Sequence, residues 1–163
     1  MRHALLALSI CAGFAASGEA AAAQADRVVI EKQRHILSLY EGDTLLQQYP
    51  VAIGRGPAGP KHCQGDDKTP EGEYSIALRV EHSAAHRALR ISYPNPADRA
   101  EAKKLGCKTG GDIMIHGLMN GYGWIGAQHR HVDWTRGCIA VTNEEMDEIW
   151  RLVPKGAKVI IKP

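Results

Sequence analysis

The sequence predicts a mostly β domain with one clear helix near its C-terminal end and a shorter helix before it. Short apolar runs bounded by glycine, proline, asparagine and aspartate recur along most of the chain, which is the pattern of strands joined by turns. Apolar residues adopt clear helical spacing only late in the chain. About 138 residues follow the N-terminal segment 1–25, which is the length of one domain, and no internal repeat is visible.

The first part of the domain is expected to contain three strands. A short apolar run covers 28–30, and a second run ends at Tyr40. A turn at 41–43 connects it to a further run at 45–51, so these two form a hairpin. Residues 54–72 then form a loop rich in Gly, Pro and Asp, and loops of this length are often functional.

The middle of the chain alternates between strand and irregular patterns. Residues 74–80 alternate apolar and polar side chains as a strand does, and 81–99 show no regular pattern. A short helix is expected over 98–105, and a buried strand over 113–115. Residues 117–131 hold four glycines and two aromatic residues, which predicts a flexible loop with aromatic walls.

The last part of the chain contains the clearest helix signal. A short apolar run at 139–141 precedes Thr142, and Glu145 three residues later completes a capping box. The helix ends before Pro154, and a final strand is expected over 159–161. One helical face carries Met146, Ile149, Trp150 and Val153.

The N-terminal residues 1–25 have the pattern of a secretory signal peptide. A basic start is followed by an apolar core over 4–16 and by small residues, with candidate cleavage sites after Ala23 and after Ala25. The alternatives are a retained alanine-rich tail and a lipoprotein anchor at Cys11. We therefore expect a periplasmic or secreted domain over 26–163, with no transmembrane segment after signal removal.

The charge pattern argues against a nucleic-acid partner. The formal net charge is +2, and no basic run or stripe of basic and aromatic residues appears.

Three cysteines remain after the signal segment: Cys63, Cys107 and Cys138. In an oxidising compartment, three cysteines leave one unpaired. If Cys138 is a nucleophile, the available disulfide is Cys63–Cys107, worth about 4 kcal/mol on chain-entropy grounds. The alternative is that both are buried thiols.

The residues best suited to chemistry are Cys138 and His116. His116 ends an apolar run before Gly117, and Cys138 follows Gly137 in a short, mostly uncharged segment. A thiol with an imidazole makes a nucleophile–base pair if the two meet. Arg136 and the nearby helix start are expected to lower the thiol pKa. The N–H groups of Gly137 and Cys138 are candidate oxyanion donors, and the Gly117 carbonyl can orient the imidazole.

Two other interpretations of these residues stay open. Cys138 can be a small core residue, and His116 a structural histidine. Separately, His129, His131 and Asp133 alternate along the chain and can converge on a metal, although their spacing matches no strong zinc pattern.

Three motifs together resemble the L,D-transpeptidase catalytic domain, the YkuD-type family. They are the Thr-Pro-x-Gly-x-aromatic segment within 68–74, the Ile-His-Gly at 115–117, and the Thr-Arg-Gly-Cys at 135–138. The resemblance implies a β-sandwich-like fold with Cys138 as nucleophile, His116 as base and peptidoglycan stem peptides as substrate. It implies a thioester formed with loss of terminal D-alanine, and neither a metal nor an organic cofactor.

Two features depart from the common family pattern. Arg136 occupies the position where most members have histidine, and Cys138 follows His116 by 22 residues, a longer gap than usual. Both features resemble the subgroup with Asp-Trp-Thr-x-Gly-Cys-Ile-Ala, which includes members thought to hydrolyse the bond between peptidoglycan and an attached lipoprotein. Thr135 and Arg136 are further candidate substrate contacts.

Three functions are therefore open. A transpeptidase is expected first, and an L,D-amidase or carboxypeptidase with the same thioester second. The third is a wall-binding domain without turnover.

Overall fold

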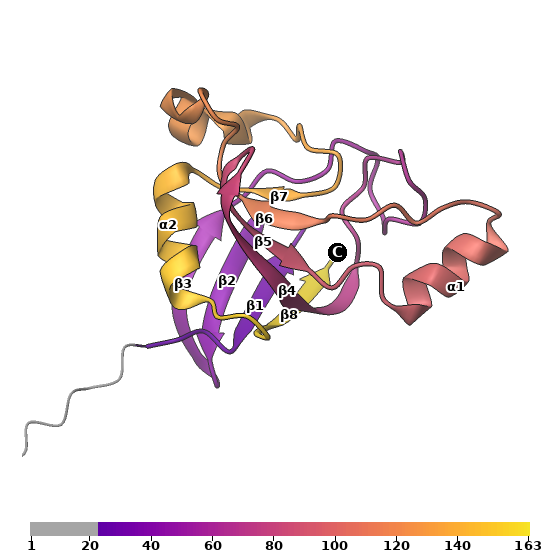
Figure 1. Ribbon diagram of the computed structural model, residues 1–163, viewed down its shortest axis with the longest axis horizontal. Helices are drawn as coiled ribbons and strands as arrows, with labels where there is room; N and C mark the ends of the chain where they lie inside the picture. Colours follow the sequence, from indigo (N-terminus) through magenta and orange to yellow (C-terminus); the bar gives the residue numbers. More distant parts are fainter. Residues whose placement is uncertain (1–22) are drawn as a thin grey trace, which may run out of the picture.

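The computed structural model describes residues 23–163 (Figure 1). Most of the expected signal segment, including Cys11, lies outside the described residues. Ala25, its last residue, is buried, and its N–H donates to the Leu152 carbonyl at 2.9 Å. No helix among the residues described is long and apolar enough to cross a membrane.

A single mixed sheet of eight strands runs in the order β3-β2-β1-β8-β4-β5-β6-β7. Its first half consists of β1 (Arg27–Glu31), β2 (Ile36–Glu41), β3 (Thr44–Pro50) and β8 (Lys158–Lys162). The predicted hairpin is β2 and β3, which pair antiparallel, whereas β1 and β8 pair parallel.

The second half of the sheet carries the candidate site. It consists of β4 (Gly72–Ser83), β5 (His86–Ile91), β6 (Met114–His116) and β7 (Ile139–Ala140). The long strand β4 belongs to both halves, since residues 72–75 pair with β8 and residues 76–83 pair with β5. The sheet bends there and folds over itself.

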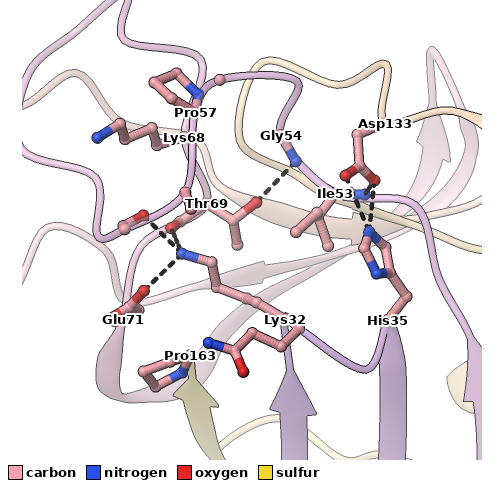
Figure 2. Close-up of a pocket in the computed structure, with 14 residues that line it drawn as sticks. Lys32, His35, Ile53, Gly54, Pro57, Lys68, Thr69, Glu71, Asp133 and Pro163 are labelled. Carbon is pink, nitrogen blue, oxygen red and sulfur yellow. Dashed lines mark hydrogen bonds and ion pairs between the residues drawn. The ribbon is translucent and has the colours of Figure 1, made fainter.

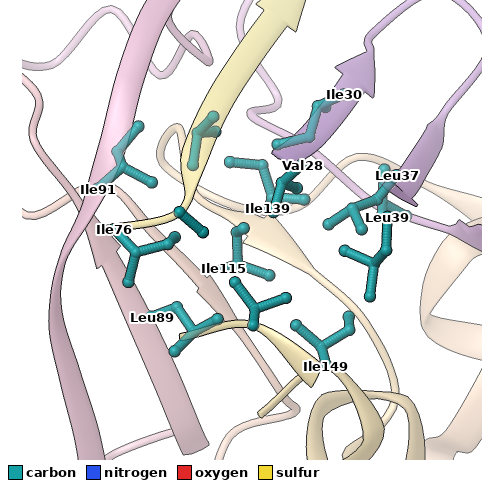
Figure 3. Close-up of a cluster of buried hydrophobic side chains, with 14 of the residues drawn as sticks. Val28, Ile30, Leu37, Leu39, Ile76, Leu89, Ile91, Ile115, Ile139 and Ile149 are labelled. Carbon is teal, nitrogen blue, oxygen red and sulfur yellow. The ribbon is translucent and has the colours of Figure 1, made fainter. Parts of the chain in front are cut away.

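The two halves enclose one hydrophobic core (Figure 3). Ile30 and Leu37 of the first half face Leu89 and Ile115 of the second, and all four side chains are fully buried. This arrangement confirms the mostly β, sandwich-like fold. Beyond β3 the chain also meets β7, where Ala52 and Ala140 exchange backbone hydrogen bonds of 3.0 and 2.8 Å.

Three helical segments accompany the sheet. The capping box at Thr142 and Glu145 starts α2 (Asn143–Leu152) as predicted, and α2 packs on β5 and β6. The shorter α1 (Pro96–Lys104) begins two residues earlier than expected because Asn95 caps it and proline is tolerated at a first helical position.

Two elements were not expected. The segment 81–99 contains β5, whose arginines interrupt an apolar alternation and whose turn from β4 has neither glycine nor proline. Within 117–131, where we expected a flexible loop, a 3-10 helix η1 (Gly123–His131) forms, kinked at Gly126.

Candidate functional site

The pairing of β6 with β7 brings the imidazole and the thiol to one face of the sheet. These strands run parallel, with Ile115 opposite Ile139 and His116 opposite Ala140. Both isoleucines point into the core, so alternation places His116, the next residue of β6, and Cys138, the residue just before β7, on the other face. Strand spacing and rise predict a separation of about 8 Å between their Cα atoms, and the Cys138 thiol hydrogen-bonds the Asp112 carbonyl, not the imidazole.

His116 is held in one orientation by its own turn. Its Nδ1 lies 2.6 Å from the Gly117 carbonyl oxygen, which can only accept, so Nδ1 carries the proton and Nε2 is left as an acceptor. Trp134 packs edge-on against the ring at 5.9 Å between centroids. His116 is 8% exposed, and burial lowers its pKa below the ordinary 6.5, opposed by the bond to Gly117.

Cys138 is a free thiol and is partly exposed. Its Sγ donates to the Asp112 carbonyl at 3.6 Å. Burial raises its pKa, and the Asp112 charge adds to that, while the Met114 backbone and the Lys61 charge oppose it. The expectation that Arg136 lowers this pKa was wrong: the Arg136 side chain is 84% exposed, near Asp67, and is not among the groups that shift the thiol.

The turn that carries the thiol is organised by Thr135. Its buried hydroxyl donates to the Cys138 carbonyl at 2.7 Å and accepts from the Gly137 N–H at 3.1 Å. The Gly137 N–H is therefore engaged within the turn and is not free as an oxyanion donor, so the Cys138 N–H remains as the candidate. Gly137 itself has φ +122, and a Cβ there would lie 2.6 Å from the Lys68 carbonyl oxygen.

The loop that contacts Gly137 is anchored by a buried lysine (Figure 2). Lys32 Nζ donates to the carbonyls of Gly59 and Thr69 and to the Glu71 carboxylate, at 2.7 to 3.0 Å. The Thr69 hydroxyl in turn accepts the Gly54 N–H at 2.9 Å. The Thr-Pro-x-Gly motif thus holds residues 68–71 against the turn at 135–138, which carries the thiol. The polar groups that line the pocket in Figure 2 mostly pair with one another.

A polar pocket of about 310 Å³ lies beside the turn at 135–138, and we call it the cationic pocket after Lys61 and Arg136, although Asp67 also lines it. The disulfide Cys63–Cys107, which confirms the predicted pairing, joins the two segments that form its walls. Lys61 is nearly buried and donates to Asp66 Oδ1 at 2.7 Å. The lining residues are Lys61, Gln64, Gly65, Asp67, Gly110, Gly111, Ile113 and Arg136.

A second, apolar pocket of about 340 Å³ adjoins His116. Trp134 joins this pocket to His116, because it lines the pocket and packs against the His116 ring. Leu118 also lines the pocket, and its N–H donates to Asn143 Oδ1 at 2.8 Å. Sequence reasoning assigned no role to Trp134, although it lies within the motif at 133–138. The expected aromatic walls of 117–131 are present here in Tyr122, whereas Trp124 does not line the pocket.

The metal alternative is not supported by the structure. His131 Nε2 pairs with Gln128 at 2.7 Å, Asp133 pairs with His35 at 2.9 Å, and His129 contacts Trp134. The three expected ligands thus have separate partners. Within residues 23–163, no three His, Cys, Asp or Glu side chains are grouped as metal ligands.

Comparisons with known proteins agree with the motifs. The sequence profile of YkuD, the L,D-transpeptidase catalytic domain, matches residues 25–161. YafK of Escherichia coli strain K12 is 34% identical over 142 residues, covering 83% of this chain and 50% of that protein.

Two solved structures share the fold. A K307A mutant of the helical cell shape determining protein Pgp2 from Campylobacter jejuni superposes with a TM-score of 0.64 at 27% identity, covering 86% of this chain and 48% of that one. An L,D-transpeptidase from Xylanimonas cellulosilytica gives 0.58 at 17% identity, covering 86% and 62%. This chain thus spans about half the length of YafK and Pgp2.

Proposed function

The chain belongs to the L,D-transpeptidase catalytic-domain family, a family of peptidoglycan-modifying enzymes, and we propose that it transfers the acyl group of a stem peptide through a thioester on Cys138. The observation that carries this proposal is the parallel register of β6 and β7, which gives the free thiol and the oriented imidazole one face of the sheet. An imidazole with Nδ1 bound to a carbonyl has Nε2 available as a base.

The first half-reaction forms the thioester. His116 Nε2 takes the thiol proton as Cys138 Sγ attacks the carbonyl carbon of the diamino acid. The Cys138 N–H is placed to stabilise the resulting oxyanion. When the intermediate collapses, the C–N bond breaks, His116 returns the proton to the departing amine, and D-alanine leaves.

The second half-reaction resolves the thioester. An amine from another stem peptide attacks the same carbonyl, and His116 takes its proton while the C–S bond breaks. The new amide is a cross-link, and Cys138 is regenerated as a thiol.

The cationic pocket suits a substrate that carries carboxylates. Stem peptides bear them, and the exposed guanidinium of Arg136 can bind one in a bidentate geometry. Lys61 is nearly buried and paired with Asp66 at 2.7 Å, so Arg136 is the cation that a substrate carboxylate can reach. We therefore assign the acyl donor to this pocket.

A hydrolase is the second candidate, and the exposure of Cys138 favours it. Water can reach a thioester on a partly exposed sulfur, which would make the chain an L,D-amidase or carboxypeptidase. A peptidoglycan–lipoprotein bond is the substrate that the Asp-Trp-Thr-x-Gly-Cys motif suggests. The resemblance to Pgp2 further suggests a role in cell shape. A wall-binding domain without turnover is the remaining alternative.

We propose that the domain acts in the periplasm or outside the cell after removal of the signal segment. Cleavage after Ala23 retains Ala25, whose side chain is buried in the core, whereas cleavage after Ala25 removes it. The first site is therefore favoured.

Muropeptide analysis by mass spectrometry distinguishes these functions. The purified domain and its Cys138→Ala variant are incubated with sacculi and with free tetrapeptide muropeptides. New cross-links with loss of D-alanine that require Cys138 support the transpeptidase. Peptide or D-alanine release without cross-links, again requiring Cys138, supports the hydrolase. Products that are equal for both proteins contradict a Cys138 enzyme.

A further inference from the structure

A pair of side chains links the turn between β1 and β2 to the residue that precedes Trp134 (Figure 2). His35 Nε2 lies 2.9 Å from Asp133 Oδ2 and 3.1 Å from Oδ1. A carboxylate only accepts, so Nε2 carries a proton whether the ring is neutral or charged. Asp133 Oδ1 also accepts the Ile53 N–H at 2.9 Å. Asp133 therefore joins two segments that lie 98 and 80 residues earlier in the chain.

The backbone of the turn at 32–35 holds His35 in place for this contact. Its φ is +51, in the left-handed region. Its N–H donates to the Lys32 carbonyl at 3.1 Å, and its carbonyl accepts the Val51 N–H at 2.9 Å. Lys32 of the same turn holds the loop that contacts Gly137. One turn thus anchors two segments that lead to the thiol, through two of its side chains.

The two residues that follow Asp133 contact both members of the proposed catalytic pair. Trp134 packs edge-on against the His116 ring at 5.9 Å between centroids. Thr135 donates its N–H to the Ile53 carbonyl at 3.2 Å, and its hydroxyl organises the turn that carries the thiol. A shift of Asp133 would therefore move the group that packs on the base and the group that shapes the nucleophile turn together.

The contact between His35 and Asp133 is expected to matter more for geometry than for stability. The His35 side chain is 44% exposed and that of Asp133 is 30% exposed. Pairs in contact with solvent add little to the free energy of unfolding, because water can satisfy both groups when they separate. What water cannot replace is the single position that the imidazole and the Ile53 N–H together give to the carboxylate.

We infer that His35 and Asp133 are positioning residues, whose contact fixes segment 133–135 and thereby holds Trp134 against the base and Thr135 in the turn of the nucleophile. The inference rests on the proposed thioester and deepens it. It gives a role to the first residue of the Asp-Trp-Thr-x-Gly-Cys segment, and to a histidine from the opposite half of the sheet.

Two substitutions of His35 separate the contact from the stability of the turn. A glutamine amide nitrogen can take the place of Nε2 and donate to Asp133, whereas the shorter asparagine amide corresponds to Nδ1 and does not reach it. Asparagine accepts the positive φ of this position better than glutamine does. A role in stability alone therefore favours His35→Asn, and a positioning role favours His35→Gln.

Acylation by a tetrapeptide, followed by mass spectrometry of the intact protein, measures the difference. In His35→Asn the acylation rate constant should fall about tenfold, the scale expected for a small misplacement of reacting groups. The KM for the donor should change less than about twofold, because His35 and Asp133 do not line the cationic pocket. His35→Gln should acylate nearly as fast as the native protein. A native rate in His35→Asn, or rates that follow the urea unfolding midpoints of the two variants, overturns the inference.

A neighbouring side chain and a double variant provide the controls. Arg34 pairs with Glu31 at 2.9 Å on the exposed side of the same turn, so Arg34→Ala should change the rate less than about twofold. A loss equal to that of His35→Asn would make any loosening of the turn sufficient and would overturn the inference. Adding His35→Asn to Asp133→Ala should slow acylation no further, because both act through one contact. Additive losses contradict this, and the His35 variants decide alone if Asp133→Ala does not fold.

NMR of the resting protein separates this inference from the proposed chemistry. His35→Asn should shift the signals of the Trp134 indole N–H and the Gly137 amide, and His35→Gln should leave both near their native positions. If the thioester forms but His35→Asn has native signals and rates, the inference is overturned and the proposed function stands. If no thioester forms in the native protein, the proposed function fails and the spectra decide the inference: unmoved signals in His35→Asn overturn it.

Discussion

His116 on β6 stands in register with Ala140 on β7, two residues beyond Cys138. The Val141 N–H donates to the His116 carbonyl at 3.0 Å and extends this pairing. The short parallel pair therefore fixes the spacing of base and nucleophile through backbone geometry, and no side-chain contact is needed to set it.

The pH dependence of the thiol follows from the two opposed pKa shifts. Burial raises the pKa of Cys138 above 9.0 and lowers that of His116 below 6.5, so at pH 7 both groups are neutral in the resting site. Iodoacetamide should therefore alkylate Cys138 slowly at pH 7 and faster as the pH rises above 9. Acylation by substrate should fall only as the pH drops below 6.5, where His116 becomes protonated and can no longer accept. Full alkylation at pH 6 would instead indicate a thiolate–imidazolium pair.

Thr135 should be needed for the shape of the thiol turn. Thr135→Val removes the hydroxyl that joins the Gly137 N–H to the Cys138 carbonyl, and it leaves a buried donor unsatisfied. We expect about 1–3 kcal/mol of lost stability and at least tenfold slower acylation. Thr135→Ser keeps the hydroxyl and should lose much less of both. Urea unfolding and the acylation rate check this, and equal values for the two variants would contradict it.

Arg136 should act in substrate binding rather than on the thiol. Its guanidinium is exposed at the cationic pocket. Arg136→Ala is expected to raise KM by about fivefold to tenfold, and Arg136→Lys by less, since lysine keeps the charge without the bidentate geometry. The alkylation profile of Cys138 against pH should not change in either variant. Unchanged steady-state kinetics in Arg136→Ala would remove Arg136 from the site.

The disulfide should stabilise the domain and the cationic pocket together. Replacing both Cys63 and Cys107 by serine releases a link across 44 residues, for which chain entropy gives about 4 kcal/mol. The loss should appear in the free energy of unfolding and as a higher KM for the donor. Reduction of the native protein should reproduce the loss and leave the double variant unaffected. A double variant as stable as the native protein would contradict the estimate.

Local signals in the sequence account for most of the fold. The capping box at Thr142 located α2, and the turn signal at 41–43 between two apolar runs located the hairpin of β2 and β3. β5 was missed because its arginines mask the apolar pattern, and because the turn before it places His86, not a glycine, at φ +59. The pairing of β6 with β7 could not be predicted, because it joins segments 23 residues apart by only two residues of each strand, and no local sequence pattern indicates such a pairing.

For the candidate site too, the sequence predicted some features and could not predict others. Cysteine counting and the motifs depend on residue type and order, and they predicted the Cys63–Cys107 disulfide, which the structure confirms, and proposed Cys138 with His116 as the reactive pair. The roles of individual backbone groups depend on the path of the turn, so the engagement of the Gly137 N–H by Thr135 could not be foreseen. Lys61 was also missed, since its position beside the thiol results from the loop that the disulfide holds.

Intact-protein mass spectrometry tests the central claim most directly. The purified domain is mixed with a tetrapeptide ending in D-alanine and quenched in acid within seconds to minutes. We predict a covalent adduct equal to the peptide minus D-alanine, mapped to Cys138 and released by hydroxylamine. The adduct should be absent from Cys138→Ala and form at least a hundredfold more slowly in His116→Gln. No adduct on Cys138 at any time, or an equal adduct in Cys138→Ala, would contradict the account.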